Sequence, residues 1–521
     1  MRLLALPGIS LFRPTSAGVS TLTPLRAVSL LMAVTFVLRL VWGAILPPTN
    51  DEAYHYLYTT HLNLSYFDHP PMTMWLAKLG ILMCGGWVHP LSLRLAFTMM
   101  FAGSTYVMYR YAGRWYGEWA GFYAALFLNL SGYYALAGGF TLPDGPFLFF
   151  ALLTMWALGE AVVANPGRIM PWVWVGLGFG CALLSKYHGI FLPAGAVLYA
   201  LVTPGARKML WSPGPYIAVV IGFAMFSPVL IWNAENGWAS FVFQGGRAVG
   251  NGFKPMGLLA VFLGPTAYLL PWVWGLVVWQ LVKKVRHWGS VQGVDRLAVC
   301  LAVVPMAFFT VVGCSRWILL HWPLIGYVAL MPMVGAVWAR WAANDSAWSR
   351  KRIALMALAV IVGGSFGVVQ ARFGVMEFPG KDPMADVSGW ASVVDELEAR
   401  GLTAEPHTFV TTDRWYDSGQ LAFALREKVP VTCYNIGDAR GFAFWSKPET
   451  WVGWNAMYVT TADEPWERQI LELFFRRVEV AADFPMTRGG VPFRQVRVYR
   501  CVEQTRPFPF TYSKEPVVLV P

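Results

Sequence analysis

The sequence predicts a polytopic α-helical membrane protein with about eleven transmembrane helices and a C-terminal α/β domain outside the membrane. First, 56% of the 521 residues are hydrophobic and only 13% are charged, about half the charged share of a soluble domain. Second, apolar runs of about 20 residues, the length that crosses a hydrocarbon core, recur with short breaks. Third, only nine of the 29 acidic residues precede residue 372. We therefore expect two parts, 1–371 in the membrane and 372–521 in water.

The predicted membrane spans follow one another closely along the first part. The first run carries Arg39 and is too long for a cleaved signal peptide, so we expect it to remain as an anchor. The expected spans are 26–46, 90–109, 118–138, 145–164, 170–185, 188–204, 214–232, 257–280, 296–313, 319–339 and 353–371.

The positions of the basic residues predict the orientation, because short loops rich in Lys and Arg stay in the cytoplasm. Such residues precede the first span and fill every second loop after it. They are Arg2, Arg13, Arg26, Arg110, Arg114, Arg168, Arg207, Lys208, Lys283, Lys284, Arg286, Arg340, Arg350, Lys351 and Arg352. Eleven crossings from a cytoplasmic N-terminus place the loop 47–89 and the domain 372–521 outside.

Five acidic residues fall on the predicted external side, in loops rich in Trp, Tyr, His and Pro. They are Asp51, Glu52, Asp68, Asp144 and Glu235. Charge close to lipid is costly and is usually retained for function. The external face is therefore the expected site of the chemistry.

Several other classes of protein and site are disfavoured. The excess of basic residues lies between apolar stretches and not along one surface, which argues against nucleic-acid binding. Six cysteines without a CxxC pair exclude a disulfide scaffold, although Cys433 and Cys501 could pair in an oxidising compartment. No histidine pair has HxxxH or HExxH spacing, so no cofactor is expected and a divalent metal is not favoured.

Ordered motifs in the external loops carry a family resemblance. The first loop reads DEAYHY from Asp51 and then YFDHPPMTMWL from Tyr66. Further motifs, in chain order, are Thr141–Pro146 (TLPDGP), Leu184–Gly189 (LSKYHG), Phe243–Arg247 (FQGGR), His321–Pro323 (HWP), Gly389–Trp390 (GW) and Gln420–Phe423 (QLAF). Together they resemble the bacterial branch of the protein O-mannosyltransferase superfamily, which includes the ArnT-like aminoarabinose transferases and the RgtA-like lipid A galacturonosyltransferases.

The resemblance implies a GT-C fold and a glycosyltransferase of the bacterial inner membrane, with its external side in the periplasm. This enzyme would take one sugar from a polyprenyl-phosphate donor, with inversion at the anomeric carbon. The acceptor would be lipid A, another envelope glycan or a protein. We expect a monomer that contacts the donor, a lipid or glycan acceptor and membrane lipids. The alternative is a polytopic transporter or lipid flippase, which is disfavoured by the absence of visible inverted repeats and by the soluble domain.

Two aspartates are the predicted catalytic residues. Such a transfer needs a carboxylate that accepts the acceptor's proton. Asp51 opens a short helix after Pro-Pro-Thr-Asn, with Asn50 or Thr49 as its expected cap. It could be the base, could position groups if the acceptor is a phosphate, or could itself only cap the helix. The resemblance makes Asp144, which lies between two prolines, a donor or acceptor contact; a plain turn aspartate is the other interpretation.

The remaining candidates are expected to bind substrate. Lys186 and Arg247 are cations on the external face and could hold the donor phosphate, although a lone Lys often only extends to the membrane surface. His69 would add positive charge only when protonated. The other predicted substrate-binding residues are Glu52, Tyr54, Asp68 and Tyr187.

The last 150 residues alternate strand-like and helix-like runs, which is typical of an α/β domain. The strands are expected at 408–411 and 456–460, and the helices at 389–400 and 465–477. We expect this domain to cover the membrane cavity and to shape the acceptor site.

Overall fold

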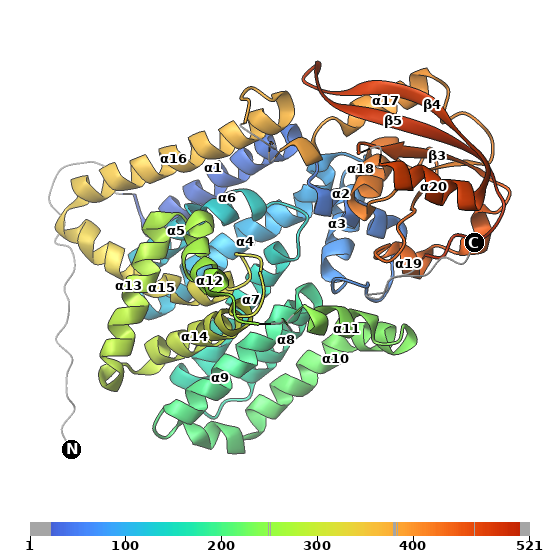
Figure 1. Ribbon diagram of the computed structural model, residues 1–521. Coiled ribbons are helices and arrows are strands. Elements are labelled where there is room, and N and C mark those ends of the chain that lie inside the picture. The colour runs from blue at the N-terminus through green and yellow to red at the C-terminus, as the bar shows by residue number, and fades with distance from the viewer. Residues whose placement is uncertain are drawn as a thin grey trace, which may run out of the picture.

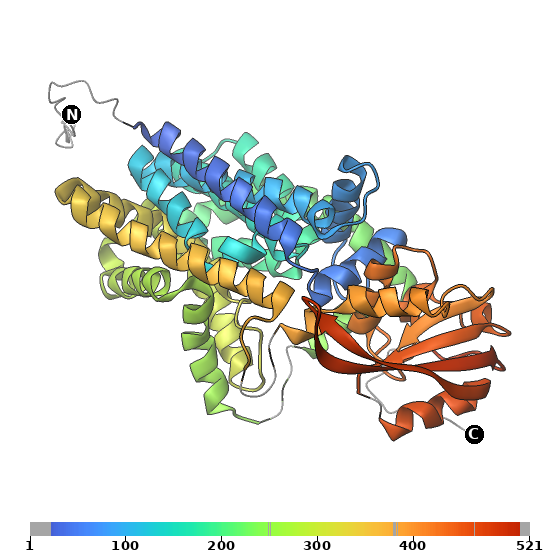
Figure 2. The same cartoon turned by 90° about the horizontal axis from the view of Figure 1, so that it is seen from above.

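The computed structural model describes residues 22–247, 250, 252–378, 382, 384–462 and 464–510. A bundle of helices occupies one end of the molecule and a sheet domain the other (Figure 1). Seen from above, α16 (Ser346–Phe373) runs along the bundle and leads into the sheet domain (Figure 2). Arg2 and Arg13, which entered the predicted orientation, lie outside the described residues.

The helices that precede the sheet domain comprise the predicted apolar stretches and three shorter segments of the predicted external loops, at 50–60, 72–83 and 239–246. They are α1 (Pro24–Ile45), α2 (Asn50–Thr60), α3 (Met72–Met83), α4 (Pro90–Tyr116), α5 (Glu118–Asn129), α6 (Gly132–Ala137), α7 (Asp144–Gly159), α8 (Met170–Ser185), α9 (Phe191–Val202), α10 (Pro213–Glu235), α11 (Ala239–Gly246), α12 (Pro255–Leu269), α13 (Pro271–Arg286), α14 (Gly293–Gly313), α15 (Leu324–Asn344) and α16.

Among the described residues, six helices are long and apolar enough to cross a membrane, judged by length and composition. They are α1, α7 with its π-helical extension to Ala164, α10, α14, α15 and α16. Four shorter apolar stretches accompany them, at α3, α8, Tyr187–Val202 and α12. The fold class of a polytopic helical membrane protein is thus confirmed, and the number of eleven spans stays a prediction.

Three predicted spans differ in detail. The stretch 257–280 is not one helix, because Leu270 has a positive φ of 67° before Pro271 and separates α12 from α13. The stretch 118–138 is likewise divided into α5 and α6. The span expected from residue 319 begins only at Leu324, after Pro323.

The C-terminal domain is built on one five-stranded mixed sheet of order β2-β1-β3-β5-β4. The strands are β1 (Thr408–Thr412), β2 (Val431–Cys433), β3 (Asn455–Thr460), β4 (Phe475–Arg488) and β5 (Val491–Gln504). The strands β1, β2 and β3 are parallel, and β5 is antiparallel to β3 and β4. The helices are α17 (Trp390–Ala399), α18 (Trp415–Leu425), α19 (Phe442–Trp445) and α20 (Pro465–Phe474). The α/β pattern is confirmed, and β2, β4 and β5 were not anticipated.

The two cysteines of this domain do not pair. Cys433 lies on β2 and Cys501 on β5, and both are free and buried. Two strands separate β2 from β5, which corresponds to roughly 14 Å at the usual strand spacing. That distance is too long for a disulfide.

The two faces of the sheet have different neighbours. Side chains alternate along β1, so that Phe409 and Val410 belong to two separate apolar cores. Val410 packs with Trp390 of α17 on one face. On the other face, Phe409 shares a core with Tyr54 and Tyr58 of α2. The predicted external loop 47–89 therefore contributes directly to the core of the C-terminal domain.

Candidate functional site

The helix α2 presents Asp51 to solvent. Thr49 is its N-cap: the Thr49 hydroxyl accepts a hydrogen bond from the Glu52 amide at 3.3 Å, and the Glu52 carboxylate accepts one from the Thr49 amide at 3.0 Å. This reciprocal arrangement satisfies the free amides of the first turn. The expectation of a cap at Asn50 or Thr49 is confirmed, and Asp51 is not the cap.

The Asp51 side chain is exposed, and no hydrogen bond or ion pair of it occurs among the described residues. Desolvation by the surrounding protein raises its pKa, while His55 opposes this and Asp68 adds to it. Because the carboxylate itself is open to water, we expect water to reduce the rise. Asp51 is thus a free carboxylate in a charged environment, which is what a proton acceptor requires.

Glu52 points away from Asp51 and is fully buried. Its carboxylate accepts a hydrogen bond from Arg94 Nε at 2.8 Å and a second from Arg94 Nη2, and the Thr141 amide donates to it at 3.0 Å. Arg94 also donates to the carbonyl oxygens of Gly43 and Leu46. The oxygens of Glu52 are thus occupied by the protein, and Glu52 joins α2 to α1 and α4. Its role in substrate binding stays a prediction.

Asp68 ends a chain of buried hydroxyl groups. The Tyr54 and Tyr58 hydroxyls lie 2.8 Å apart, and Tyr58 donates to Asp68 at 2.6 Å. The Gly441 amide donates to the Tyr54 hydroxyl at 2.8 Å. Tyr54 is only 1% exposed. The Tyr54 ring thus lies inside the shared core, and its contact with substrate stays a prediction.

Arg440 of the C-terminal domain reaches Asp68. Its Nη1 lies 3.7 Å from Asp68 Oδ2, and its guanidinium lies 4.4 Å from the centre of the Trp415 ring. Burial alone would raise the pKa of Asp68, but neighbouring groups, among them Arg440 and the Tyr58 hydroxyl, lower it. Asp68 is therefore ionised and only 2% exposed, which favours an orienting role over direct contact with substrate.

His69 is neutral at ordinary pH. Burial lowers its pKa to about 3, which leaves Arg440 and Tyr58 as the groups that keep Asp68 ionised. Its ring lies 5.5 Å from that of His55, centre to centre. A charged role for His69 requires its protonated form, which this lowered pKa disfavours near neutral pH, and its contact with substrate stays a prediction.

Asp144 and Lys186 form an ion pair. Lys186 Nζ lies 2.8 Å from Asp144 Oδ1, and both side chains are largely buried. Asp144 begins α7, and Lys186 ends α8 in an extended conformation. Tyr133 and His321, whose rings stack at 5.3 Å, lie close to the pair. Each charge therefore has a partner of opposite sign, which the sequence alone did not indicate.

Arg247 is held by aromatic rings. Its guanidinium lies 5.3 Å from the centre of the Phe243 ring and 4.8 Å from that of Trp322. Among the residues that the structure describes, no carboxylate lies within ion-pair distance of it, although Asp51 and Asp68 are close enough to influence its pKa. An arginine without an acidic partner in this position is available to an anionic ligand.

Tyr187 lies beside Lys186 in the chain, and its ring packs against Phe226 and Phe241. Its role in substrate binding stays a prediction.

For metals, the described ranges contain no group of three or more His, Cys, Asp or Glu side chains that could hold an ion.

The structure thus brings Asp51, Asp68, His69, Lys186 and Arg247 into one electrostatic cluster with Asp144. Sequence reasoning missed Arg94 and Arg440. A single arginine inside an apolar stretch signals function or a buried partner, so Arg94 could have been noticed. Nothing in the sequence around Arg440 marks it.

Comparison with known proteins agrees with the motifs. Residues 68–232 match the family described as dolichyl-phosphate-mannose-protein mannosyltransferase. The chain is 25% identical over 304 residues to the lipid A galacturonosyltransferase RgtD of Rhizobium johnstonii, in an alignment that covers 56% of this chain. It spans 59% of the length of that relative.

Solved structures give the fold over nearly the whole chain. ArnT from Cupriavidus metallidurans, solved with undecaprenyl phosphate and without it, superposes with a TM-score of 0.62 at 17% identity, covering 91% of this chain and 97% of ArnT. The chain has the ArnT-like GT-C fold. The mycobacterial arabinofuranosyltransferase AftD matches with a TM-score of 0.50 at 12% identity, over 92% of this chain and 40% of AftD. The predicted GT-C fold is thereby confirmed.

Within this ArnT-like GT-C fold, the motifs lie in two places. The first-loop motifs, TLPDGP, LSKYHG, FQGGR and HWP supply the cluster around Asp51. The GW and QLAF motifs lie instead on α17 and α18, beside the segment that precedes Asp51.

Proposed function

We propose that this protein is a membrane glycosyltransferase that moves one sugar from a polyprenyl-phosphate carrier to a lipid acceptor. The proposal rests on two groups of the same cluster. Asp51 is an exposed carboxylate, and Arg247 has no acidic partner among the residues described. The ArnT structure with undecaprenyl phosphate and the lipid A relative support the donor and acceptor classes. They do not favour a transporter or flippase.

In the proposed reaction, an acceptor oxygen attacks the anomeric carbon and a new C–O bond forms. The bond between that carbon and the phosphate oxygen breaks, and its electron pair stays on the phosphate. If the acceptor is a hydroxyl group, its proton passes to Asp51. If the acceptor is a phosphate, no proton has to be removed and Asp51 orients groups.

The leaving phosphate would be held by Arg247 and Lys186. The planar guanidinium of Arg247 can contact two phosphate oxygens. Lys186 uses one of its three N–H groups for Asp144, which leaves two for a ligand. Asp144 would then orient Lys186, and the contact to substrate would be made by the lysine.

We further propose that the site faces the periplasm. The basic residues of the loops predict this orientation. Reporter fusions after Gly167 and Gly289 should give cytoplasmic signals, and fusions after Leu62 and Gly401 periplasmic ones. A cytoplasmic signal at Gly401 would contradict the orientation.

The function is tested by mass spectrometry of lipid A and other envelope glycans from a deletion strain, complemented with the wild type or with Asp51→Asn. We expect one hexose- or pentose-type mass increment to disappear on deletion and to return only with the wild type. Identical glycan and lipid A profiles in all strains would contradict the proposal.

A further inference from the structure

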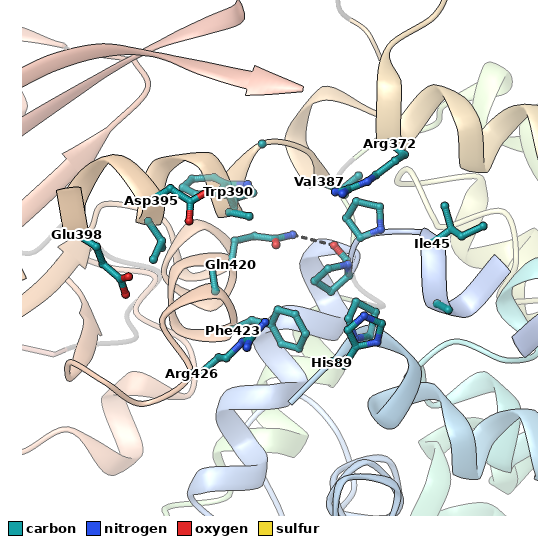
Figure 3. Close-up of a pocket in the computed structure, with 18 of the residues that line it drawn as sticks. Ile45, His89, Arg372, Val387, Trp390, Asp395, Glu398, Gln420, Phe423 and Arg426 are labelled. Atoms are coloured by element: carbon teal, nitrogen blue, oxygen red, sulfur yellow. Dashed lines mark hydrogen bonds between the residues drawn. The ribbon is translucent and has the colours of Figure 1, made fainter. Parts of the chain in front are cut away.

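A cavity of about 610 Å³ lies between the helical bundle and the C-terminal domain. Its walls come from the ends of α1 and α16, the start of α4, and the helices α17 and α18 (Figure 3). None of the residues of the cluster around Asp51 lines it. The GW and QLAF motifs do, through Gly389, Trp390, Gln420 and Phe423.

The cavity adjoins the outer, apolar surface of the bundle. Ile45, at the end of α1, lines the cavity and is 44% exposed. Val41, one turn earlier, and Phe373, which follows the cavity residue Arg372 on α16, are also exposed. In a membrane protein, such a surface faces acyl chains. A lipid lying against α1 and α16 would therefore place its head group at the cavity.

Two arginines at the cavity have no acidic partner among the described residues. They are Arg372 and Arg426. The third cation, Lys428, is already paired with Glu398 at 2.7 Å. Guanidinium groups without a carboxylate partner suit a phosphate group, because each can donate two parallel hydrogen bonds.

The backbone at Arg426 is held in an unfavourable conformation. Arg426 and Glu427 have φ values of 52° and 62°, the left-handed region that residues other than glycine rarely adopt. Glu427 accepts a hydrogen bond from the Tyr56 hydroxyl at 3.2 Å, which fixes this turn against α2. Strained backbone of this kind is concentrated at ligand-binding sites.

Carboxylates line the side of the cavity formed by α17. Asp395 and Glu398 lie on the opposite side of the cavity from Arg372 and Ile45 (Figure 3). Asp395 has no ion-pair partner within the described part of the chain. The cavity thus combines an adjoining apolar surface, two available guanidinium groups and one available carboxylate.

We propose that this cavity binds a membrane phospholipid whose head group carries a phosphate and a primary amine, as in phosphatidylethanolamine. The phosphate would contact Arg372 and Arg426, the ammonium group would contact Asp395, and the acyl chains would lie along α1 and α16. Gln420, which lines the cavity, donates hydrogen bonds at 3.0 Å to the Pro48 carbonyl and to Asn50 Oδ1. A lipid bound here would therefore contact the segment that leads to Asp51 without occupying the proposed transfer site.

The test measures binding of short-chain phosphatidylethanolamine, phosphatidylglycerol and phosphatidylcholine to the purified full-length protein by isothermal titration calorimetry. The wild type should prefer the ethanolamine lipid. Arg372→Gln and Arg426→Gln should each weaken binding of the ethanolamine and glycerol lipids by roughly tenfold, the scale of one lost charge-assisted hydrogen bond. Asp395→Asn should weaken binding of the ethanolamine lipid alone.

Arg350→Gln is the matched control, because Arg350 is an exposed arginine near the other end of α16. Its binding should equal that of the wild type, and unfolding curves should show that all variants are folded. Equal affinity for the three lipids, or unchanged binding in both cavity arginine variants, would overturn the proposal. Glycerophosphoethanolamine, which has no acyl chains, should bind much more weakly; equal binding would overturn the assignment of a lipid.

Discussion

The ammonium nitrogen of Lys186 lies 2.8 Å from the Asp144 carboxylate, with both side chains largely buried. Each residue therefore satisfies the charge of the other. A carboxylate held in this way is a poor proton acceptor, because protonating it would leave the ammonium group buried without its partner. Asp51, which is exposed and unpaired among the described residues, remains the stronger candidate for the base.

The first prediction concerns the stability that the ion pair of Asp144 and Lys186 contributes. Asp144→Asn leaves a buried ammonium group and Lys186→Gln leaves a buried carboxylate, and both should lower the melting temperature. The double variant should melt closer to the wild type than the sum of the two single effects predicts, since residues in contact are not additive. Thermal unfolding in detergent measures this. Strictly additive losses would show that the two groups do not stabilise each other.

The second prediction concerns Asp51. Asp51→Asn keeps the shape and removes the charge, so transfer should fall by roughly 10²-fold or more while the protein still folds. The measurement is sugar transfer from a synthetic polyprenyl-phosphate donor. Glu235→Gln, at an exposed carboxylate on the same predicted face, is the control and should be fully active.

The pH dependence of transfer gives a further check on Asp51. The pKa of Asp51 is raised, chiefly by desolvation, and only the ionised form can accept a proton. For a hydroxyl acceptor, activity should therefore rise with pH, with its midpoint above the ordinary pKa of an aspartate, about 3.9. The Asn variant should lose this limb of the profile. A wild-type rate that does not change with pH through this range would contradict the role as base.

The third prediction concerns the donor phosphate. Arg247→Lys keeps the charge but loses the planar fork, so binding of polyprenyl phosphate should weaken. Lys186→Ala should weaken it too, and the double variant should fall short of the sum of the single effects because both cations address one phosphate. Binding assays on the three variants test this. Unchanged binding in both folded single variants would place the donor site elsewhere.

The fourth prediction concerns the buried pair of Glu52 and Arg94. Glu52→Gln leaves the Arg94 charge uncompensated and should destabilise the protein by about 3–5 kcal/mol. Glu398→Gln, at an exposed pair with Lys428, should change stability by less than about 1 kcal/mol. Burial opposes the ionisation of Glu52, but Arg94 and two backbone amides outweigh it and lower its pKa.

The sign of the pH effect follows from this lowered pKa. The stabilisation by Glu52 should be complete above the ordinary glutamate pKa and should disappear as the pH falls through the folded-state pKa. Melting temperatures of the wild type and of Glu52→Gln should therefore converge in acid. A difference that is the same at every pH would mean that shape, and not charge, sets the effect.

The fifth prediction tests the contact between α18 and α2. A Cβ atom on Gly419 would lie 2.9 Å from the backbone N and Cα of Tyr54. Backbone atoms cannot move aside as a flexible side chain can, so Gly419→Ala should separate the two helices and reduce both stability and transfer. Gly367→Ala in α16, where nothing lies within 4 Å of the added atom, is the control and should be neutral or slightly stabilising.

The sequence predicted those helices and strands that short stretches of neighbouring residues specify. Apolar length placed the helices, and the β-rich runs around Phe409 and Tyr458 placed two strands correctly. The break at Leu270 was missed because both sides of Pro271 are equally apolar, so that hydropathy alone could not divide the stretch. The strands β4 and β5 were missed because their charged outer residues interrupt the apolar pattern.

For the site, the motifs identified segments that the structure brings together, but they did not show which side chains pair with one another. Asp51 and Glu52 are adjacent, and no local signal shows that one faces water while the other meets Arg94. The ion pair of Asp144 with Lys186 and the contact of Arg440 with Asp68 join residues that are distant in the chain. Such relationships depend on packing, which a single sequence does not encode in any short pattern.

The shared core of α2 and the C-terminal domain has a consequence for biosynthesis. The hydrogen bond from Gly441 to Tyr54 joins residues 387 positions apart. At a synthesis rate of about 5–20 residues per second, the C-terminal residues that pack against the tyrosines of α2 are synthesised roughly 20–80 seconds after those tyrosines. During that interval an aromatic surface emerges beside a growing set of membrane helices. We therefore expect the nascent chain to need a holding factor, or the membrane surface itself, until translation is complete.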